Sequence, residues 1–421
     1  RGRNITIGAV VGMLLSCTVA MGADPPDTEE VGLNITNNGS GIKIDKVIPG
    51  NTLKGNTYTN NTEILGESST GTEEGIGINI DGESRKTNLT LVNNGMISGK
   101  SSVERAYGII VENLGENSKF NFINNGTVLG ETTSPTFGKQ SGYGIYIGSN
   151  LGSSTLVNNG LISAKGYHTT GIYVLETRIE TLNNNGLILA SGDNSGDGIY
   201  IFQKAFLKAI ENKGLILAKN IGIFTYTLSS YGEDTDTYIN EGAILGAGEG
   251  IHISSSINGD ASVVTNRGII SEENLAKECA GIKVVGSNGT NDRVGTLTND
   301  GLISARGNDA SSGIKTQFSG RVGNLISNGL ILSNEIGIRS TYVTATKKGK
   351  IGNIVNNGTI SAEKYGIATN PTDNNGGLIG KITNTGVIYG KENAIKKVEG
   401  TDNKGEIGDT INYGILVNGA N

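Results

Sequence analysis

The sequence "NNGLISA" at Asn158–Ala164, followed by "GIYV" at Gly171–Val174, is one copy of a unit that recurs along almost the whole chain. The glycine after the Asn pair marks each copy. From Gly95 to Gly414 this marker recurs in eleven steps over 319 residues, or 29 residues per step. A fixed period of this length is typical of solenoid proteins, in which each repeat is one supersecondary unit.

Each copy holds three short apolar stretches. In the second stretch, "GIYI" at Gly144–Ile147 becomes "GIHI" at Gly250–Ile253, so the third position varies while its neighbours stay aliphatic. A third stretch, such as "TLVNN" at Thr155–Asn159, precedes each Asn pair. Alternation with a period of two indicates strands with one buried face. We therefore predict an all-β fold, a right-handed parallel β-helix of about 14 coils with about 29 residues per coil.

The Asn and Gly residues at the corner between strands have expected structural roles. Both residue types tolerate a positive φ, which predicts a turn with that backbone conformation. Stacked coils also place each Asn above the next at about 4.8 Å, so the amides are expected to form a hydrogen-bonded ladder. The glycine of each "GI" stretch is expected to let successive backbones approach closely.

The composition agrees with a thin core and excludes some functions. The chain has no Trp, 5% aromatic residues and 66 glycines, as expected for a solenoid whose coils contact only their neighbours. It has 34 basic and 40 acidic residues without a basic stripe, so nucleic-acid binding is not expected. Two cysteines cannot make a disulfide framework, and Cys279 is expected to be a partly buried thiol.

Residues 1–23 have two arginines, an uncharged run and small residues, which predicts a secretory signal peptide cleaved near Ala23. Two alternatives stay open: lipidation at Cys17, since "LLSC" resembles a lipobox, and an uncleaved membrane anchor. Residues 24–82 are expected to form an N-terminal linker, a cap and irregular first coils. Residues 83–421 are expected to form the β-helix, which stops in mid-repeat and suggests truncation.

No catalytic, cofactor or metal site is expected. Glycoside hydrolysis needs paired carboxylates, for which the candidates are Asp193 with Asp197, and Glu233 with Asp234 and Asp236. These residues lie in Gly/Ser/Thr-rich segments, where solvated acidic side chains are ordinary. The histidines His168 and His252 cannot bind a metal by themselves, and His252 is expected to be exposed at a variable outward position.

One set of aromatic residues recurs at the variable outward position of consecutive coils, and it comprises Tyr146, Tyr173, Tyr200 and Phe224. Two interpretations stay open for these residues. They stack along one face and stabilise the sheet, or they form a strip that binds a glycan or a partner protein.

The signal "RNITIGAVVGMLLSCTVA" together with repeated "NNGxIxA…GIxV" coils resembles the passenger region of type V autotransporters of fusobacterial type. This resemblance covers essentially the whole chain. It implies export through the inner membrane, passage through an outer-membrane translocator barrel, and folding at the cell surface. The implied function is that of a non-enzymatic adhesin or other virulence-related stalk, whose partner is a host or bacterial surface protein or glycan.

One feature departs from the family pattern: residues 380–421 do not resemble the C-terminal barrel strands of an autotransporter. Two other functions therefore stay open. One is a secreted carbohydrate-active β-helix enzyme, similar to pectin lyases, and the other is a periplasmic or lipid-anchored spacer.

Overall fold

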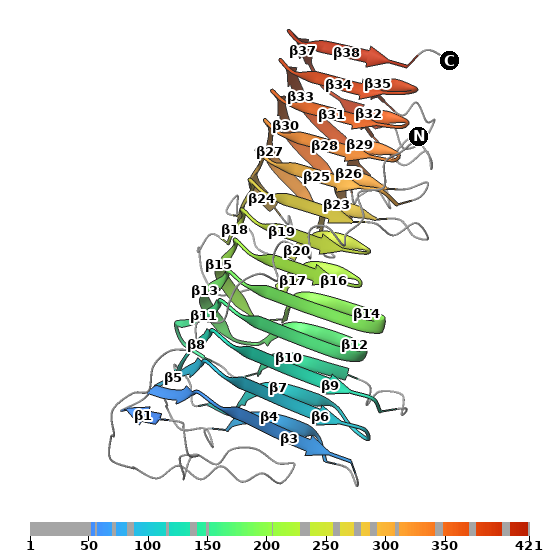
Figure 1. Ribbon diagram of the computed structural model, residues 1–421. Coiled ribbons are helices and arrows are strands. Elements are labelled where there is room, and N and C mark those ends of the chain that lie inside the picture. Colours follow the sequence, from blue (N-terminus) through green and yellow to red (C-terminus); the bar gives the residue numbers. More distant parts are fainter. Residues whose placement is uncertain are drawn as a thin grey trace.

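The protein is an all-β parallel β-solenoid with at least ten turns of about 28 residues each, as the computed structural model shows (Figure 1). The structure describes residues 52–419 except 55–56, 70–72, 82–87, 115–117, 135–140, 149–150, 204, 228–235, 256–261, 273–278, 287–292, 308–310, 342–347, 370–375 and 398–404. The predicted fold class is confirmed at this level, while its right-handed sense stays a prediction. The predicted signal peptide, Cys17 and the first repeat at Gly39 lie outside the described residues.

The first sheet collects the strands that precede each Asn pair, and its strands pair in parallel except at β1, which is antiparallel to β2. Its strands are β1 (Thr52–Lys54), β2 (Thr57–Asn60), β5 (Asn88–Asn93), β8 (Lys119–Asn124), β11 (Ser154–Asn158), β13 (Arg178–Asn184), β15 (Phe206–Asn212), β18 (Thr237–Asn240), β21 (Ser262–Asn266), β24 (Arg293–Asn299), β27 (Arg321–Ser327), β30 (Lys350–Asn356), β33 (Leu378–Asn384), β36 (Glu406–Ile407) and β37 (Thr410–Asn412).

The second sheet collects the two remaining strands of each turn. The strands after the corner glycine are β3 (Glu63–Ser68), β6 (Met96–Ser101), β9 (Thr127–Thr132), β12 (Leu161–Leu175), β14 (Leu187–Gln203), β16 (Leu215–Ala218), β19 (Ala243–Gly246), β22 (Ile269–Glu272), β25 (Leu302–Ala305), β28 (Leu330–Ser333), β31 (Thr359–Ala362), β34 (Val387–Gly390) and β38 (Ile415–Asn418). The strands that hold the "GI" stretch are β4 (Gly75–Asp81), β7 (Ala106–Glu112), β10 (Ser141–Gly148), β17 (Ile221–Thr227), β20 (Glu249–Ser255), β23 (Ala280–Val285), β26 (Ser312–Gln317), β29 (Ile336–Ser340), β32 (Tyr365–Ala368) and β35 (Asn393–Lys396), while β12 and β14 continue through both segments.

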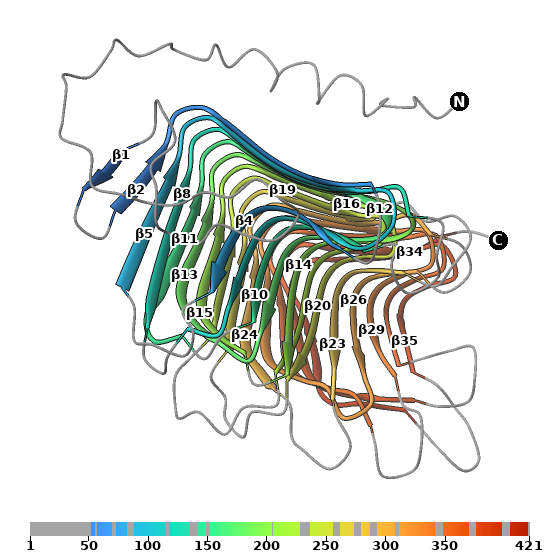
Figure 2. The ribbon, with the colours of Figure 1, turned by 90° about the horizontal axis from the view of Figure 1, so that it is seen from below.

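One narrow apolar core runs along the rod. Each turn contributes inward side chains from its three strand segments, for example Leu156, Ile162 and Ile172, each with at most 2% of its surface exposed. Seen along the axis, the strands of successive turns lie over one another (Figure 2). Full burial of such a side chain contributes about 1.5–3 kcal/mol, so the core repeats its stabilisation in every coil.

The predicted Asn ladder is confirmed. Most first-sheet strands end in a buried Asn whose amide donates to the Asn of the next coil, as from Asn124 to Asn158 (2.8 Å) and from Asn158 to Asn184 (2.7 Å). The chain of bonds runs from Asn60 to Asn299, then resumes from Asn356 to Asn412. It is interrupted at β27, where Ser327 occupies the ladder position.

The predicted reason for the corner glycine is wrong. Among the described glycines only Gly166 has a positive φ, so the corner glycines do not serve a left-handed turn. Space is the cause: a Cβ on Gly160 would lie 2.0 Å from the carbonyl oxygen of Gly126 in the preceding coil. Close approach at the "GI" glycine is confirmed, since a Cβ on Gly144 would lie 2.5 Å from the oxygen of Gly171.

Candidate functional site

The predicted aromatic residues form one continuous stack on the outer face of the second sheet. The parallel register places Tyr146 beside Tyr173, Tyr173 beside Tyr200, and Tyr200 beside Phe224. Successive ring centroids are 5.2, 5.3 and 4.5 Å apart, with interplanar angles of 3°, 5° and 19°. The structure therefore brings all four side chains together, one per coil.

The stack continues into a small apolar cluster separate from the main core. Ile76, Tyr107 and Ile110 are buried there, and the partly buried Tyr143 and Tyr146 pack against them. The rings of Tyr107 and Tyr143 are stacked at 5.0 Å, and Tyr107 meets Tyr146 edge to face. Sequence reasoning missed this extension because Tyr107 and Tyr143 precede the "GI" stretch rather than occupy its third position.

Stacking limits what these rings can bind. Both faces of Tyr173 and Tyr200 are covered by neighbouring rings, so their open surface consists of ring edges and hydroxyl groups. Burial raises the pKa of Tyr146 and of Tyr200 to about 12 and also raises that of Tyr173. At neutral pH the stack therefore presents a row of protonated hydroxyls that can donate hydrogen bonds.

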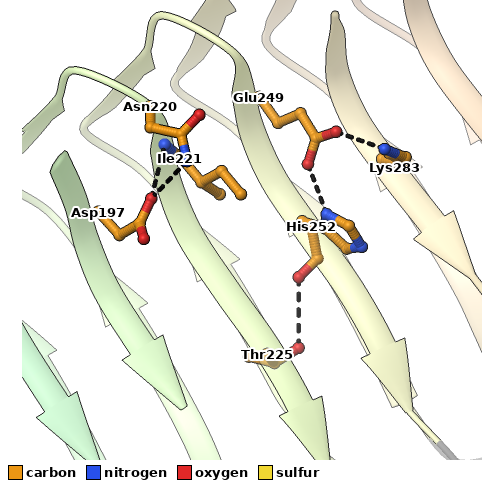
Figure 3. Close-up of polar contacts among 7 residues, drawn as sticks. All are labelled: Asp197, Asn220, Ile221, Thr225, Glu249, His252 and Lys283. Atoms are coloured by element: carbon orange, nitrogen blue, oxygen red, sulfur yellow. Dashed lines mark hydrogen bonds and ion pairs between the residues drawn. The ribbon is translucent and has the colours of Figure 1, made fainter. Parts of the chain in front are cut away.

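A charged cluster follows the stack in the next coils (Figure 3). The His252 ring meets Phe224 edge to face at 4.8 Å, and its Nδ1 lies 2.5 Å from Glu249 Oε2. Lys283 Nζ lies 2.6 Å from the other oxygen of Glu249. Burial by itself raises the pKa of Glu249, but the hydrogen bonds and charges of His252 and Lys283 outweigh it and lower the pKa to about 2.

The expectation that His252 is exposed is wrong. Its side chain points outward as predicted, but only 14% of it is exposed because Phe224 and Glu249 pack against it. Glu249 and His252 lie three positions apart in β20, on either side of Gly250, and their contact places both side chains on the same side of the strand.

Asp197 also differs from its expected place in a solvated loop. It lies in β14, half-buried, and its carboxylate accepts hydrogen bonds from Asn220 Nδ2 (2.9 Å) and from the backbone N–H of Ile221 (3.1 Å) (Figure 3). Burial raises the pKa of Asp197 to about 6, and the nearby charge of Glu249 adds to the rise. Asp197 and Glu249 occupy one outward column with Ile221 between them.

The remaining candidates do not converge on a site. Asp193 is exposed, and the His168 ring stacks edge to face on Tyr167 with its Nδ1 3.0 Å from Ser195 Oγ. Asp236 is buried with 3% exposed surface, while Glu233 and Asp234 lie outside the described residues. Cys279 is more buried than predicted, at 2% exposed, and is not in a disulfide.

Across the described ranges, no group of three or more His, Cys, Asp and Glu side chains could hold a metal ion. In the same part of the chain, no helix has the length and apolar character needed to span a membrane.

Sequence reasoning missed the contact of Glu249 with His252 and that of Lys283 with Glu249. A signal exists in the sequence, because "EGIHI" at 249–253 and "GIKV" at 281–284 place a base at the same outward position of neighbouring repeats. Glu249, the residue before the glycine, contacts both bases, and only the structure shows these contacts.

Comparison with known proteins gives no further assignment: no protein-family model, no curated protein and no solved structure matches the chain.

Proposed function

We propose that this chain is the passenger of an autotransporter-like protein, a right-handed β-helix exported to the cell surface or secreted, and that it acts as a non-enzymatic adhesin or cell–cell contact stalk. The proposal rests on the difference between the inward and the outward side-chain positions along the rod. Inward positions repeat from coil to coil, whereas outward positions change from aromatic to charged along one continuous column. A rigid scaffold that varies only its outer side chains suits recognition of an extended partner.

The aromatic stack is the proposed contact surface. Tyr146, Tyr173 and Tyr200 offer apolar ring edges and hydroxyl donors at a regular spacing of about 5 Å. This surface suits a surface protein or glycan whose acceptors also repeat along a line. A flat sugar face lying on a ring is a poor match, since the ring faces are occupied by one another.

A binding test can remove the hydroxyls and leave the stack intact. In the double variant Tyr173→Phe/Tyr200→Phe, we expect binding of the labelled full chain to bacterial and epithelial cells and to a glycan array to fall by about tenfold, with an unchanged melting temperature. The matched control is Tyr226→Phe, whose ring stacks on Phe202 in the neighbouring column. Equal binding by the wild type and the double variant rules out the stack as the contact surface.

One observation favours a second candidate function, a secreted carbohydrate-active enzyme. Asp197 and Glu249 lie two coils apart, about 10 Å along the column, close to the separation of the two carboxyl groups in inverting glycosidases. Their pKa values are displaced in opposite directions, to about 6 and about 2, as an acid and a base require. Release of reducing sugar from polysaccharides by the wild type, and its loss in both Asp197→Asn and Glu249→Gln, supports this candidate; no release from any polysaccharide removes it.

A further inference from the structure

A second ladder of Asn side chains lies on the outside of the corner, next to the buried one. Several of the residues before the corner glycines are exposed asparagines, and each donates to the equivalent residue of the coil before it, as from Asn125 to Asn94 (2.9 Å) and from Asn357 to Asn328 (2.8 Å). In these coils the corner reads Asn–Gly. Within the described residues, such corners occur at Asn94, Asn125, Asn159, Asn185, Asn328 and Asn357.

An Asn–Gly corner is chemically labile. Asn is a thermolabile residue, and a following glycine has no Cβ to shield its backbone nitrogen. That nitrogen attacks the side-chain amide carbon of the Asn, so a new C–N bond closes a five-membered succinimide. The side-chain nitrogen takes the proton of the attacking nitrogen and leaves as ammonia. Water then opens the ring at either carbonyl carbon and gives aspartate or isoaspartate, so the reaction consumes one water, releases one ammonia and needs no enzyme.

The folded corner holds the glycine nitrogen away from this reaction. The N–H of Gly126 donates to the carbonyl oxygen of Asn93 at 3.0 Å, and that of Gly329 donates to the carbonyl oxygen of Asn299 at 2.8 Å. A nitrogen that is bonded to the neighbouring coil cannot turn onto the side chain of the residue before it. Deamidation must therefore proceed from a corner that has opened locally, and its rate reports how often that corner opens.

The buried ladder predicts which corner opens most often. Asn125 follows Asn124, whose amide is bonded to the buried Asn of both neighbouring coils. Asn328 instead follows Ser327, whose buried Oγ has no hydrogen-bond partner among the described residues. The coil of Asn328 is therefore joined to neither neighbour by the buried ladder, and its corner is the least restrained of the Asn–Gly corners.

The products of deamidation do not fit this corner. The Nδ2 atom of Asn328 donates to Asp300 Oδ1 at 2.7 Å, so deamidation sets two carboxylates against each other, and like charges opposite one another destabilise neighbouring strands. Isoaspartate also adds a methylene group to the backbone. The corner has no space for it, since a Cβ on Gly329 would already lie 2.1 Å from the carbonyl oxygen of Gly301. A corner that opens and reacts cannot close as before.

We propose that Asn328 is a site of spontaneous deamidation, and that its conversion to aspartate or isoaspartate permanently loosens the rod at β27. Water is the only co-reactant, so the modification accumulates with the age of the folded chain. Asn357 is expected to follow Asn328 in rate, because Asn356 before it keeps a ladder bond on one side, to Asn384. The inference goes beyond the proposed function and does not depend on it.

Peptide mapping by mass spectrometry of the full chain, incubated in mildly alkaline buffer, measures the deamidation rate at each Asn–Gly corner. We expect Asn328 to react about fivefold faster than Asn125 or Asn159, as the loss of one hydrogen bond implies. In chain unfolded by urea, all corners share the same local chemistry and their rates are expected to converge. Equal rates at Asn328 and Asn125 in the folded chain overturn the proposal, and so does a difference that persists in urea.

Variants at the gap test its role in the reaction. Ser327→Asn closes the gap and is expected to slow deamidation at Asn328 to the rate at Asn125. Ser327→Ala keeps the gap, and we expect Asn328 to react in it as in the wild type. An unchanged rate at Asn328 in a folded Ser327→Asn variant overturns the gap as the cause, while the rate order in the wild type is decisive whether or not this variant folds.

Variants at the labile residue test the loosening of the rod. Asn328→Gln keeps an amide but closes a six-membered ring far more slowly, so amide hydrogen exchange in β27 is expected to stay the same before and after incubation. The matched control, Asn125→Gln, is expected to age as the wild type does, with faster exchange in β27. An incubated wild type in which Asn328 has reacted, but exchange in β27 has not changed, overturns the proposed loosening.

Discussion

At the scale of single residues, Asp197 is an acidic side chain whose burial changes its protonation. Burial raises its pKa to about 6, and the two hydrogen bonds from Asn220 and Ile221 lower it only in part. Since the ordinary pKa of Asp is near 4, the folded state prefers the protonated form. The stability that Asp197 contributes is therefore complete below pH 4 and is lost as the pH rises through about 6.

The variant Asp197→Asn tests this assignment, since Asn is uncharged and keeps an oxygen that can accept both hydrogen bonds. At pH 7.5 we expect the variant to be more stable than the wild type by about 1–3 kcal/mol, because no buried charge remains. At pH 4 we expect the difference to disappear. Thermal unfolding followed by circular dichroism at both pH values measures it, and an equal difference at the two values contradicts burial of the Asp197 charge as the cause.

At the scale of the elements, the corner glycines leave room for the close spacing that the hydrogen-bonded strands of neighbouring coils require. Gly126, Gly160 and Gly186 lie one above another, and each faces the carbonyl oxygen of the glycine in the coil before it. The same backbones form the hydrogen bonds that hold neighbouring coils, such as Leu161 N–H to Gly126 O at 2.9 Å. A larger residue at this corner must push two strands apart, not merely adopt a different turn.

Replacing Gly160 by Ala is expected to destabilise the rod by about 2–4 kcal/mol, because the new methyl group meets backbone atoms that cannot move independently. The matched control is Gly248→Ala, whose methyl group first meets the Oδ1 atom of the Asn220 side chain, at 2.9 Å. We expect an effect below about 1 kcal/mol for the control. Amide hydrogen exchange of the neighbouring coils is the measurement, and similar protection in the two variants refutes a steric role for Gly160.

Much of the fold could be predicted from the sequence because the repeat carries it. The period of Asn-Asn-Gly located the strands, and the Asn ladder and the stack from Tyr146 to Phe224 follow from placing equivalent positions above one another. The contact of Asp197 with Ile221, and that of Glu249 with Lys283, could not be predicted, because loops of unequal length separate these residues and only the register aligns them.

At the scale of the whole molecule, the Asn ladder joins many coils into one cooperative unit, with a single interruption inside the described part of the chain. At β27, Ser327 replaces Asn, and its Oγ and the Oδ1 of Asn356 are buried without a hydrogen-bond partner. The ladder therefore consists of one run up to Asn299 and another from Asn356. In repeat proteins each coil contacts only its neighbours, so a junction that lacks the ladder bond is expected to open more easily than one that has it.

The variant Ser327→Asn is expected to join the two runs, because its amide can accept from Asn299 and donate to the orphaned oxygen of Asn356. We expect a gain of about 1–3 kcal/mol across this junction, read as slower amide exchange in β24, β27 and β30. Ser327→Ala, which cannot bond to either neighbour, serves as the control. Faster exchange in the Asn variant than in the wild type shows that the junction has no room for the amide.

The gap at Ser327 has a mechanical consequence. When such a rod is pulled along its axis, the side-chain ladder adds resistance only where it is continuous, so the junctions on both sides of β27 bear the load without it. We expect the run from Asn60 to Asn299 and the run that begins at Asn356 to open as two separate units. A single serine therefore sets where the ladder divides under load.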